Sequence, residues 1–82
     1  MSVTPAQRRV LPALCRPVAT GGAPASNRHV ADELVVAVDT VKGTLGRLFE
    51  IFGIGDDVPQ NQKRAMLARR ALQSGIVRRD EL

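Results

Sequence analysis

Apolar residues recur every three or four positions in four stretches of the chain, the spacing of one face of an α-helix. The third stretch has the clearest pattern, with an apolar face made of Val38, Val41, Leu45, Leu48, Phe49 and Phe52. No segment alternates apolar and polar residues as a half-buried strand does. The sequence therefore predicts an all-α, single domain over residues 1–82, with four helices at about residues 5–15, 27–34, 39–52 and 60–74.

Local signals mark both ends of the first helix. Thr4 can cap it, Pro5 suits the first helical position, and Gln7 stands where a capping box needs Glu or Gln. Pro12 lies inside the helix and is expected to kink or loosen its second turn. Pro17 is expected to end it.

The other helices have similar end signals. Either Ser26 or Asn27 can cap the second helix. Because Ala37 has no side chain that can cap, we expect the third helix to start at Asp39. Gly75 is expected to end the fourth helix as its C-terminal cap.

The second and third helices are joined by a short apolar turn at residues 35–38, with Ala31 on one helix facing Val41 on the other. A turn this short forces a steep crossing, and the small Ala31 side chain allows the helices to approach. The pattern favours a helix-turn-helix domain. Tight helical corners also occur in proteins that never contact DNA, so the pattern alone leaves both alternatives open.

Composition excludes several classes of protein. An 82-residue chain buries only about 60% of its unfolded surface, which leaves little room for a catalytic cleft. One Cys cannot form a disulfide framework, so a cytoplasmic location fits better than secretion. No apolar stretch approaches the roughly 18 residues that span a membrane. Without clusters of metal ligands or nucleophiles, we expect no enzyme, metal or cofactor.

The net charge of +4 falls into three blocks. Residues 1–31 carry four Arg and no acid, residues 32–57 carry six acids against Lys42 and Arg47, and residues 58–82 carry six basic residues against two acids. The basic balance favours a polyanionic partner. It is not concentrated on the third helix, so the other helices must supply much of the attraction.

Several segments together resemble the LuxR-type (GerE/NarL-like) DNA-binding domain. They are SNRHVADEL at residues 26–34, TVK at 40–42, RLFE at 47–50, FGI at 52–54 and the fourth helix with its GIV ending at 75–77. Residues 58–65, VPQNQKRA, are similar to a subgroup in which this domain follows a forkhead-associated, phosphothreonine-binding domain. The resemblance covers nearly the whole chain and suggests one module of a longer regulator.

The resemblance implies a tetrahelical transcription-factor domain whose third helix enters the major groove of double-stranded DNA. Lys42 and the residues at positions 43 and 46 would face the bases. The residues near the phosphates would be Asn27, Arg28, Thr40, Thr44 and Arg47. In the family the fourth helix often forms the contact between two copies, which implies a homodimer.

Two positions depart from the family's pattern. Gly43 and Gly46 stand where its members often carry base-reading side chains, and Asp39 and Glu50 flank them. Either the backbone approaches DNA very closely, or this helix reads little sequence. The second alternative leads to a different hypothesis, a tetrahelical protein-interaction module that has lost base reading.

Met66 is the large apolar residue on the polar side of the fourth helix, among Lys63, Arg69 and Arg70. Scattered apolar side chains are often simply exposed, which is the preferred interpretation. Alternatively, Met66, Arg69 and Arg70 form a surface for self-association or for a partner.

Overall fold

The computed structural model describes residues 3–82, which form four α-helices and one 3₁₀ turn. The elements are α1 (Pro5–Ala19), α2 (Asn27–Leu34), α3 (Val38–Ile51), α4 (Gln60–Ser74) and η1 (Arg79–Glu81). Residues 3–82 contain no strand. The prediction of an all-α, four-helix domain is confirmed.

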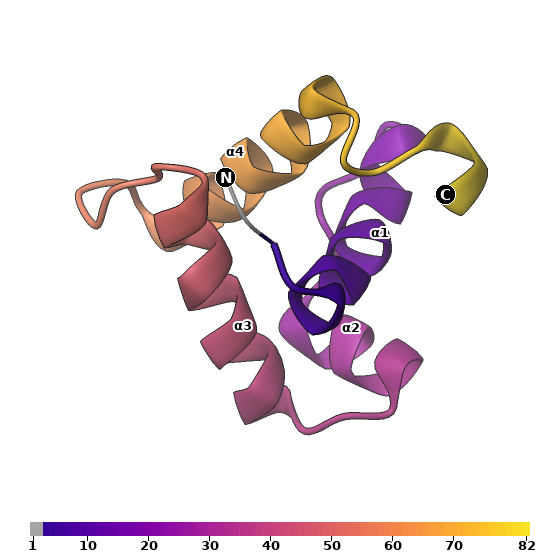
Figure 1. Ribbon diagram of the computed structural model, residues 1–82, viewed down its shortest axis with the longest axis horizontal. Helices are drawn as coiled ribbons and strands as arrows, with labels where there is room; N and C mark the ends of the chain where they lie inside the picture. Colours follow the sequence, from indigo (N-terminus) through magenta and orange to yellow (C-terminus); the bar gives the residue numbers. More distant parts are fainter. Residues whose placement is uncertain (1–2) are drawn as a thin grey trace.

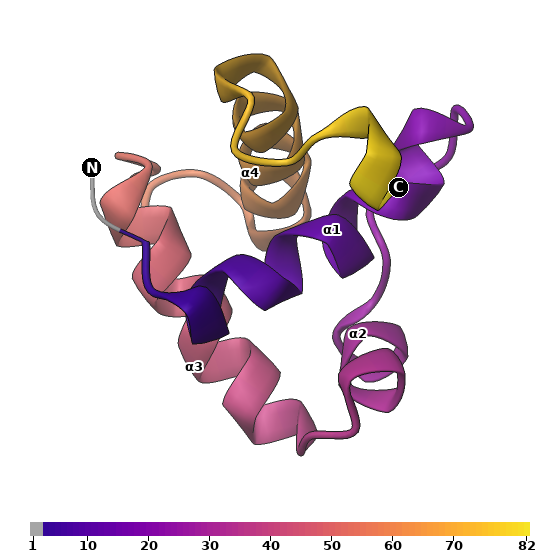
Figure 2. The same ribbon diagram turned by 45° about the vertical axis from the view of Figure 1, so that its right-hand side comes forward.

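Helix α1 lies at the centre of the fold and packs against each of the other three α-helices. Figures 1 and 2 show α2 and α3 joined by a short turn on one side of α1, with α4 on the other. The core includes these fully buried side chains: Leu11, Leu14, Cys15, Val30, Val41, Leu45, Leu48 and Leu67. Ala31 and Val41 are both buried, as the spacing of the second and third helices predicts.

Cys15 is a packing residue in this core. Its Sγ donates a hydrogen bond to the carbonyl oxygen of Ala68 on α4, at 3.7 Å. Burial disfavours the thiolate and raises the pKa of Cys15 to about 11. The thiol is therefore protonated and poorly nucleophilic at neutral pH.

Helix α1 starts as predicted but ends four residues later. The Gln7 N–H donates to Thr4 Oγ1 at 3.1 Å and the Thr4 N–H to Gln7 Oε1 at 3.0 Å, so the capping box is confirmed. The expectation that Pro17 ends the helix is wrong. The helix runs to Ala19, and the carbonyl of Pro17 accepts hydrogen bonds from the N–H groups of Thr20 and Gly22. The C-terminal turn of α1 therefore follows Pro17 and is held by the hydrogen bonds to the Pro17 carbonyl.

The turn between α2 and α3 differs from the prediction by one residue. Ser26 caps α2, since its Oγ accepts from the His29 N–H at 3.1 Å. Val35 ends α2 in the left-handed region, with φ 58° and ψ 51°. The turn then comprises residues 35–37, and α3 begins at Val38 rather than Asp39 although Ala37 supplies no side-chain cap. Burial of the inner face of α3 outweighs the missing cap.

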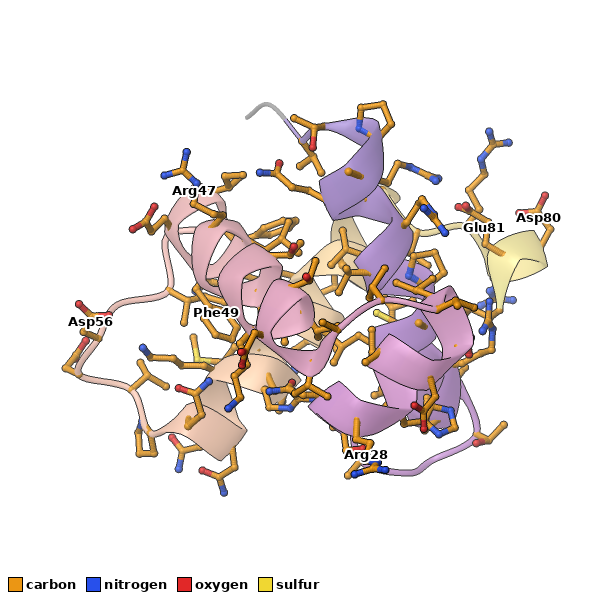
Figure 3. All side chains as sticks on the ribbon, turned by 90° about the horizontal axis from the view of Figure 1, so that it is seen from below. Arg28, Arg47, Phe49, Asp56, Asp80 and Glu81 are labelled. Atoms are coloured by element: carbon orange, nitrogen blue, oxygen red, sulfur yellow. The ribbon has the colours of Figure 1, made fainter. Side chains whose placement is uncertain are left out.

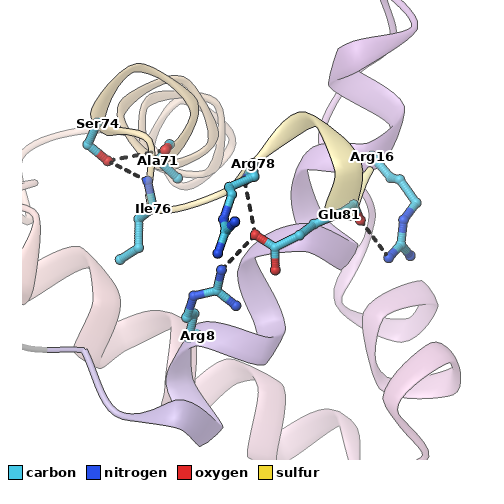
Figure 4. Close-up of polar contacts among 7 residues, drawn as sticks. All are labelled: Arg8, Arg16, Ala71, Ser74, Ile76, Arg78 and Glu81. Carbon is cyan, nitrogen blue, oxygen red and sulfur yellow. Dashed lines mark hydrogen bonds and ion pairs between the residues drawn. The ribbon is translucent and has the colours of Figure 1, made fainter.

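The fourth helix has the predicted bounds, with Gly75 as its C-terminal cap at φ 79°. After it the chain returns to α1 (Figure 4). Glu81 Oε1 accepts from Arg8 Nη2 at 2.6 Å and from the Arg78 N–H at 3.0 Å, while Arg16 donates to the Glu81 carbonyl at 3.2 Å. The hydrogen bond from Arg8 is the main reason why the pKa of Glu81 lies below its ordinary value. Within residues 3–82, none of the helices has the length and apolar content to cross a membrane.

Candidate nucleic-acid interface

Helix α3 has a buried inner face and an exposed outer face. Val41, Leu45 and Leu48 of the inner face are fully buried against α1 and the rest of the core. The outer face is exposed and contains four of the predicted DNA contacts: Lys42, Gly43, Gly46 and Arg47. The fold therefore presents these four positions together to the outside.

A polar hollow of about 390 Å³ lies beside this outer face, between α3, the following loop and the start of α4. Figure 3 shows Arg47, Phe49 and Asp56 on this side of the molecule. Lys63 and Gln60 of α4 contribute to the hollow, although the sequence did not indicate them as site residues. Its lining residues are Lys42, Gly43, Gly46, Arg47, Phe49, Glu50, Ile54, Asp56, Gln60 and Lys63.

The charges around this hollow are mixed. Lys63 Nζ lies 3.3 Å from Asp56 Oδ1 and 5.6 Å from the centre of the Phe49 ring. Arg47 lies 3.8 Å from Glu50, and both side chains are about three-quarters exposed, so the pair stabilises the helix very little. In the part of the chain that the structure describes, Lys42 has no ion-pair partner. Lys42 is thus a free cation on the outer face.

The fold of the chain itself does not explain Gly43 and Gly46. A Cβ atom added at either position would meet nothing within 4 Å. Both glycines lie within α3, where Gly destabilises a helix by about 1 kcal/mol relative to Ala. By contrast, Gly53 and Gly75 have positive φ angles, which other residues adopt with strain. Only the first pair leaves its bare backbone accessible without a local structural reason.

Thr40 and Thr44 lie at the other edge of α3, around a small hollow of about 110 Å³ shared with the start of α1. Arg9 of α1 lines the same hollow, next to the two predicted phosphate contacts. Sequence reasoning missed Arg9 because its neighbours come from a helix more than thirty residues away. The preceding residue, Arg8, instead forms an ion pair with Glu81.

The start of α2 carries the last two predicted contacts, Asn27 and Arg28. Arg28 is exposed and points outward in Figure 3. Asn27 is half-buried, and its Oδ1 accepts a hydrogen bond from Arg64 of α4, which also donates to the carbonyl of Ala25. Desolvation lowers the pKa of Arg64. Nothing in the local sequence indicates this contact.

The three residues predicted as a dimer or partner surface have different environments. Met66 is partly buried and packs against the core, so the preferred interpretation of simple exposure is wrong. Arg70 donates to the carbonyl of Phe52. Arg69 is exposed beside a groove of about 520 Å³ between α4 and the end of α1, whose lining includes Val18, Pro24 and Leu72. Arg69 alone remains fully available to a partner.

Residues 3–82 contain no cluster of three or more His, Cys, Asp or Glu side chains that could hold a metal ion. Comparisons with models of protein families, with curated proteins and with solved structures give no match.

Proposed function

We propose that this chain is a LuxR-type helix-turn-helix DNA-binding domain of a transcriptional regulator, whose α3 enters the major groove of duplex DNA. The observation that carries the proposal is the outer face of α3, where the free Lys42 adjoins the bare backbone of Gly43 and Gly46. Because Gly43 and Gly46 have no side chains on this outer face, the helix backbone can approach base edges closely. Lys42 can donate to guanine O6 or N7 there.

Phosphate contacts would flank this helix on both sides. Thr40, Thr44 and Arg47 are placed along α3, and Arg28 at the start of α2 is exposed. Arg9, beside Thr40 and Thr44, adds a further cation. Such contacts position a protein on the duplex and release counterions, so they account for affinity rather than for sequence choice.

The wider setting of the domain belongs to the same proposal. We propose a non-enzymatic, cytoplasmic module that pairs with a second copy through α4, with Arg69 at the contact. In a longer chain it would follow a forkhead-associated domain that supplies the input signal. The similarity of residues 58–65 to that subgroup supports this arrangement.

A salt titration of duplex binding tests the proposal. We expect binding to a mixed-sequence duplex at low salt and a steep loss of affinity as salt rises. Lys42→Ala should weaken binding by about 1–3 kcal/mol, the value of a base contact. Arg79→Ala, which removes an exposed charge on η1 away from α3, is the matched control. Absence of binding at low salt, or equal losses in both variants, would contradict the proposed docking face.

The second candidate is a tetrahelical protein-interaction module without base reading. The mostly apolar groove between α1 and α4 and the acidic Glu50 and Asp56 near α3 favour it. Sedimentation over a range of concentrations, with and without duplex, separates the two functions. A protein partner that binds when DNA affinity is absent would favour the interaction module.

A further inference from the structure

Arg64 connects α4 to the start of α2 through two hydrogen bonds. Its Nη1 donates to Asn27 Oδ1 and its Nη2 to the carbonyl of Ala25, residues that lie 37 and 39 positions away in the chain. Ala25 is itself buried and donates its N–H to the Leu14 carbonyl at 3.2 Å. The guanidinium therefore closes a connection between α4, the loop before α2, and α1.

This contact determines which end of the Asn27 amide faces outward. A guanidinium only donates hydrogen bonds, so the atom turned toward Arg64 must be the amide oxygen. The NH₂ group is then on the opposite side, and within residues 3–82 it has no hydrogen-bond partner. Arg64 leaves the side chain of Asn27 with two fixed, unused donor hydrogens.

Two backbone N–H groups near the start of α2 already have hydrogen-bond acceptors. The His29 N–H donates to Ser26 Oγ and the Val30 N–H to the Ser26 carbonyl, which completes the helix cap without the Asn27 side chain. Arg28 projects from the next position and is exposed (Figure 3). The Asn27 amide is therefore not needed for capping, although it is held in one orientation.

We propose that Arg64 is a positioning residue for duplex binding, which acts by holding the Asn27 amide with its NH₂ group free to donate to a DNA phosphate. The inference rests on the proposed function and adds a residue that does not itself touch DNA. The second hydrogen bond, to the Ala25 carbonyl, holds the guanidinium itself in place. Fixing the donor before binding reduces the entropy lost when the phosphate arrives.

A double-mutant cycle between Arg64 and Asn27 tests the inference. Asn27→Ala should weaken duplex binding roughly five-fold, the effect of one lost hydrogen bond. Arg64→Lys keeps the charge but not the planar fork that holds two acceptors, so it should cause a similar loss. Combined, the two substitutions should weaken binding no more than either alone. Additive losses would overturn the inference.

The salt dependence separates positioning from direct contact. A residue that neutralises a phosphate contributes about 0.9 to the slope of log affinity against log salt. Arg64→Met should change this slope by less than half of that value, whereas a full change would show that Arg64 binds phosphate itself. Arg70→Met is the matched control, because Arg70 similarly donates from α4 to a backbone carbonyl, that of Phe52. It should leave duplex affinity unchanged.

An NMR measurement without DNA keeps the inference testable whatever the variants do to affinity. Relaxation of the Asn27 side-chain NH₂ nitrogen should give a high order parameter in the wild type and a lower one in Arg64→Met. Asn61, exposed on α4, is the internal reference. An Asn27 order parameter in the wild type as low as that of Asn61 would overturn the inference alone, while a wild-type protein that binds no duplex would overturn the proposed function as well.

Discussion

The two faces of α3 differ in what accounts for their residues. On the inner face, Val41, Leu45 and Leu48 are fully buried and their size and polarity follow from packing. On the outer face, Gly43 and Gly46 have open space where a side chain could stand. One helix thus combines a face explained by folding with a face that folding does not explain.

The proposed function attributes this difference to an external contact with the outer face. Alanine at positions 43 and 46 would fit and would stabilise the helix, so stability does not account for glycine there. A partner that approaches the helix backbone, as we propose, would account for it.

Leu45→Ala should cause the largest loss of stability on α3. Leu45 is fully buried, and truncating such a side chain removes about 2–5 kcal/mol from the free energy of unfolding. Small domains have only about 5–15 kcal/mol in total, so the change should be obvious in urea unfolding. Lys42→Ala, its outer-face control, should change the unfolding free energy by less than about 0.5 kcal/mol. Similar losses in both would remove the distinction between the faces.

Replacing Gly43 and Gly46 together with alanine should change stability and binding in opposite directions. Each substitution should raise the free energy of unfolding by about 1 kcal/mol, because neither Cβ meets a neighbour. The same methyl groups should hinder close approach and weaken duplex binding at least ten-fold. Thermal unfolding and a duplex titration on one sample measure both effects.

Gly75→Ala is the control for that pair. Gly75 has φ 79°, so its replacement should destabilise the protein rather than stabilise it. If the double variant of α3 gains stability and binds duplex as well as the wild type, close backbone approach is wrong. The protein-interaction alternative would then be favoured.

The sequence predicted the parts of this fold that depend on neighbouring residues. The Thr4–Gln7 capping box, a cap of α2 at either Ser26 or Asn27, the Gly75 end and the buried stripe of α3 all follow from spacings of a few positions. The end of α1 did not. A proline such as Pro17 is expected to end a helix, but here the N–H groups of Thr20 and Gly22 donate to the Pro17 carbonyl, and the helix continues to Ala19.

The candidate site was predictable to the same extent. Helical periodicity put Lys42, Gly43, Gly46 and Arg47 on one face of α3, and these residues are exposed together. Which cations remain free depends on tertiary contacts. Arg8 and Arg9 are adjacent in sequence, yet only Arg8 pairs with Glu81. Contacts between residues tens of positions apart cannot be recognised from the periodic spacing of residues along the sequence.

Val35→Gly should stabilise the protein by about 1 kcal/mol. Val35 is β-branched and has φ 58°, a left-handed conformation that is strained for such a residue. The residue is 88% exposed, so its replacement by glycine loses little apolar burial. Thermal unfolding measures the gain, and Val36→Gly, at a neighbouring position without positive φ, should destabilise. A loss of stability in Val35→Gly would show that the exposed valine contributes to the fold.

Glu81→Gln should have the smallest effect, and one that depends on pH. Arg8 and the Arg78 N–H favour the carboxylate and hold the pKa of Glu81 below its ordinary 4.5. The ionised group therefore stabilises the fold above that ordinary value, and the contribution is lost as the pH falls through the lowered, folded-state pKa. Wild type should melt slightly above Glu81→Gln at pH 7, and the difference should disappear as the pH falls through the lowered pKa of Glu81. Glu50→Gln, which removes the exposed partner of Arg47 on the outer face, should show no such convergence because that pair contributes little at any pH. Equal pH profiles for the two variants would mean that the Arg8–Glu81 ion pair stabilises the fold no more than the exposed Arg47–Glu50 pair does.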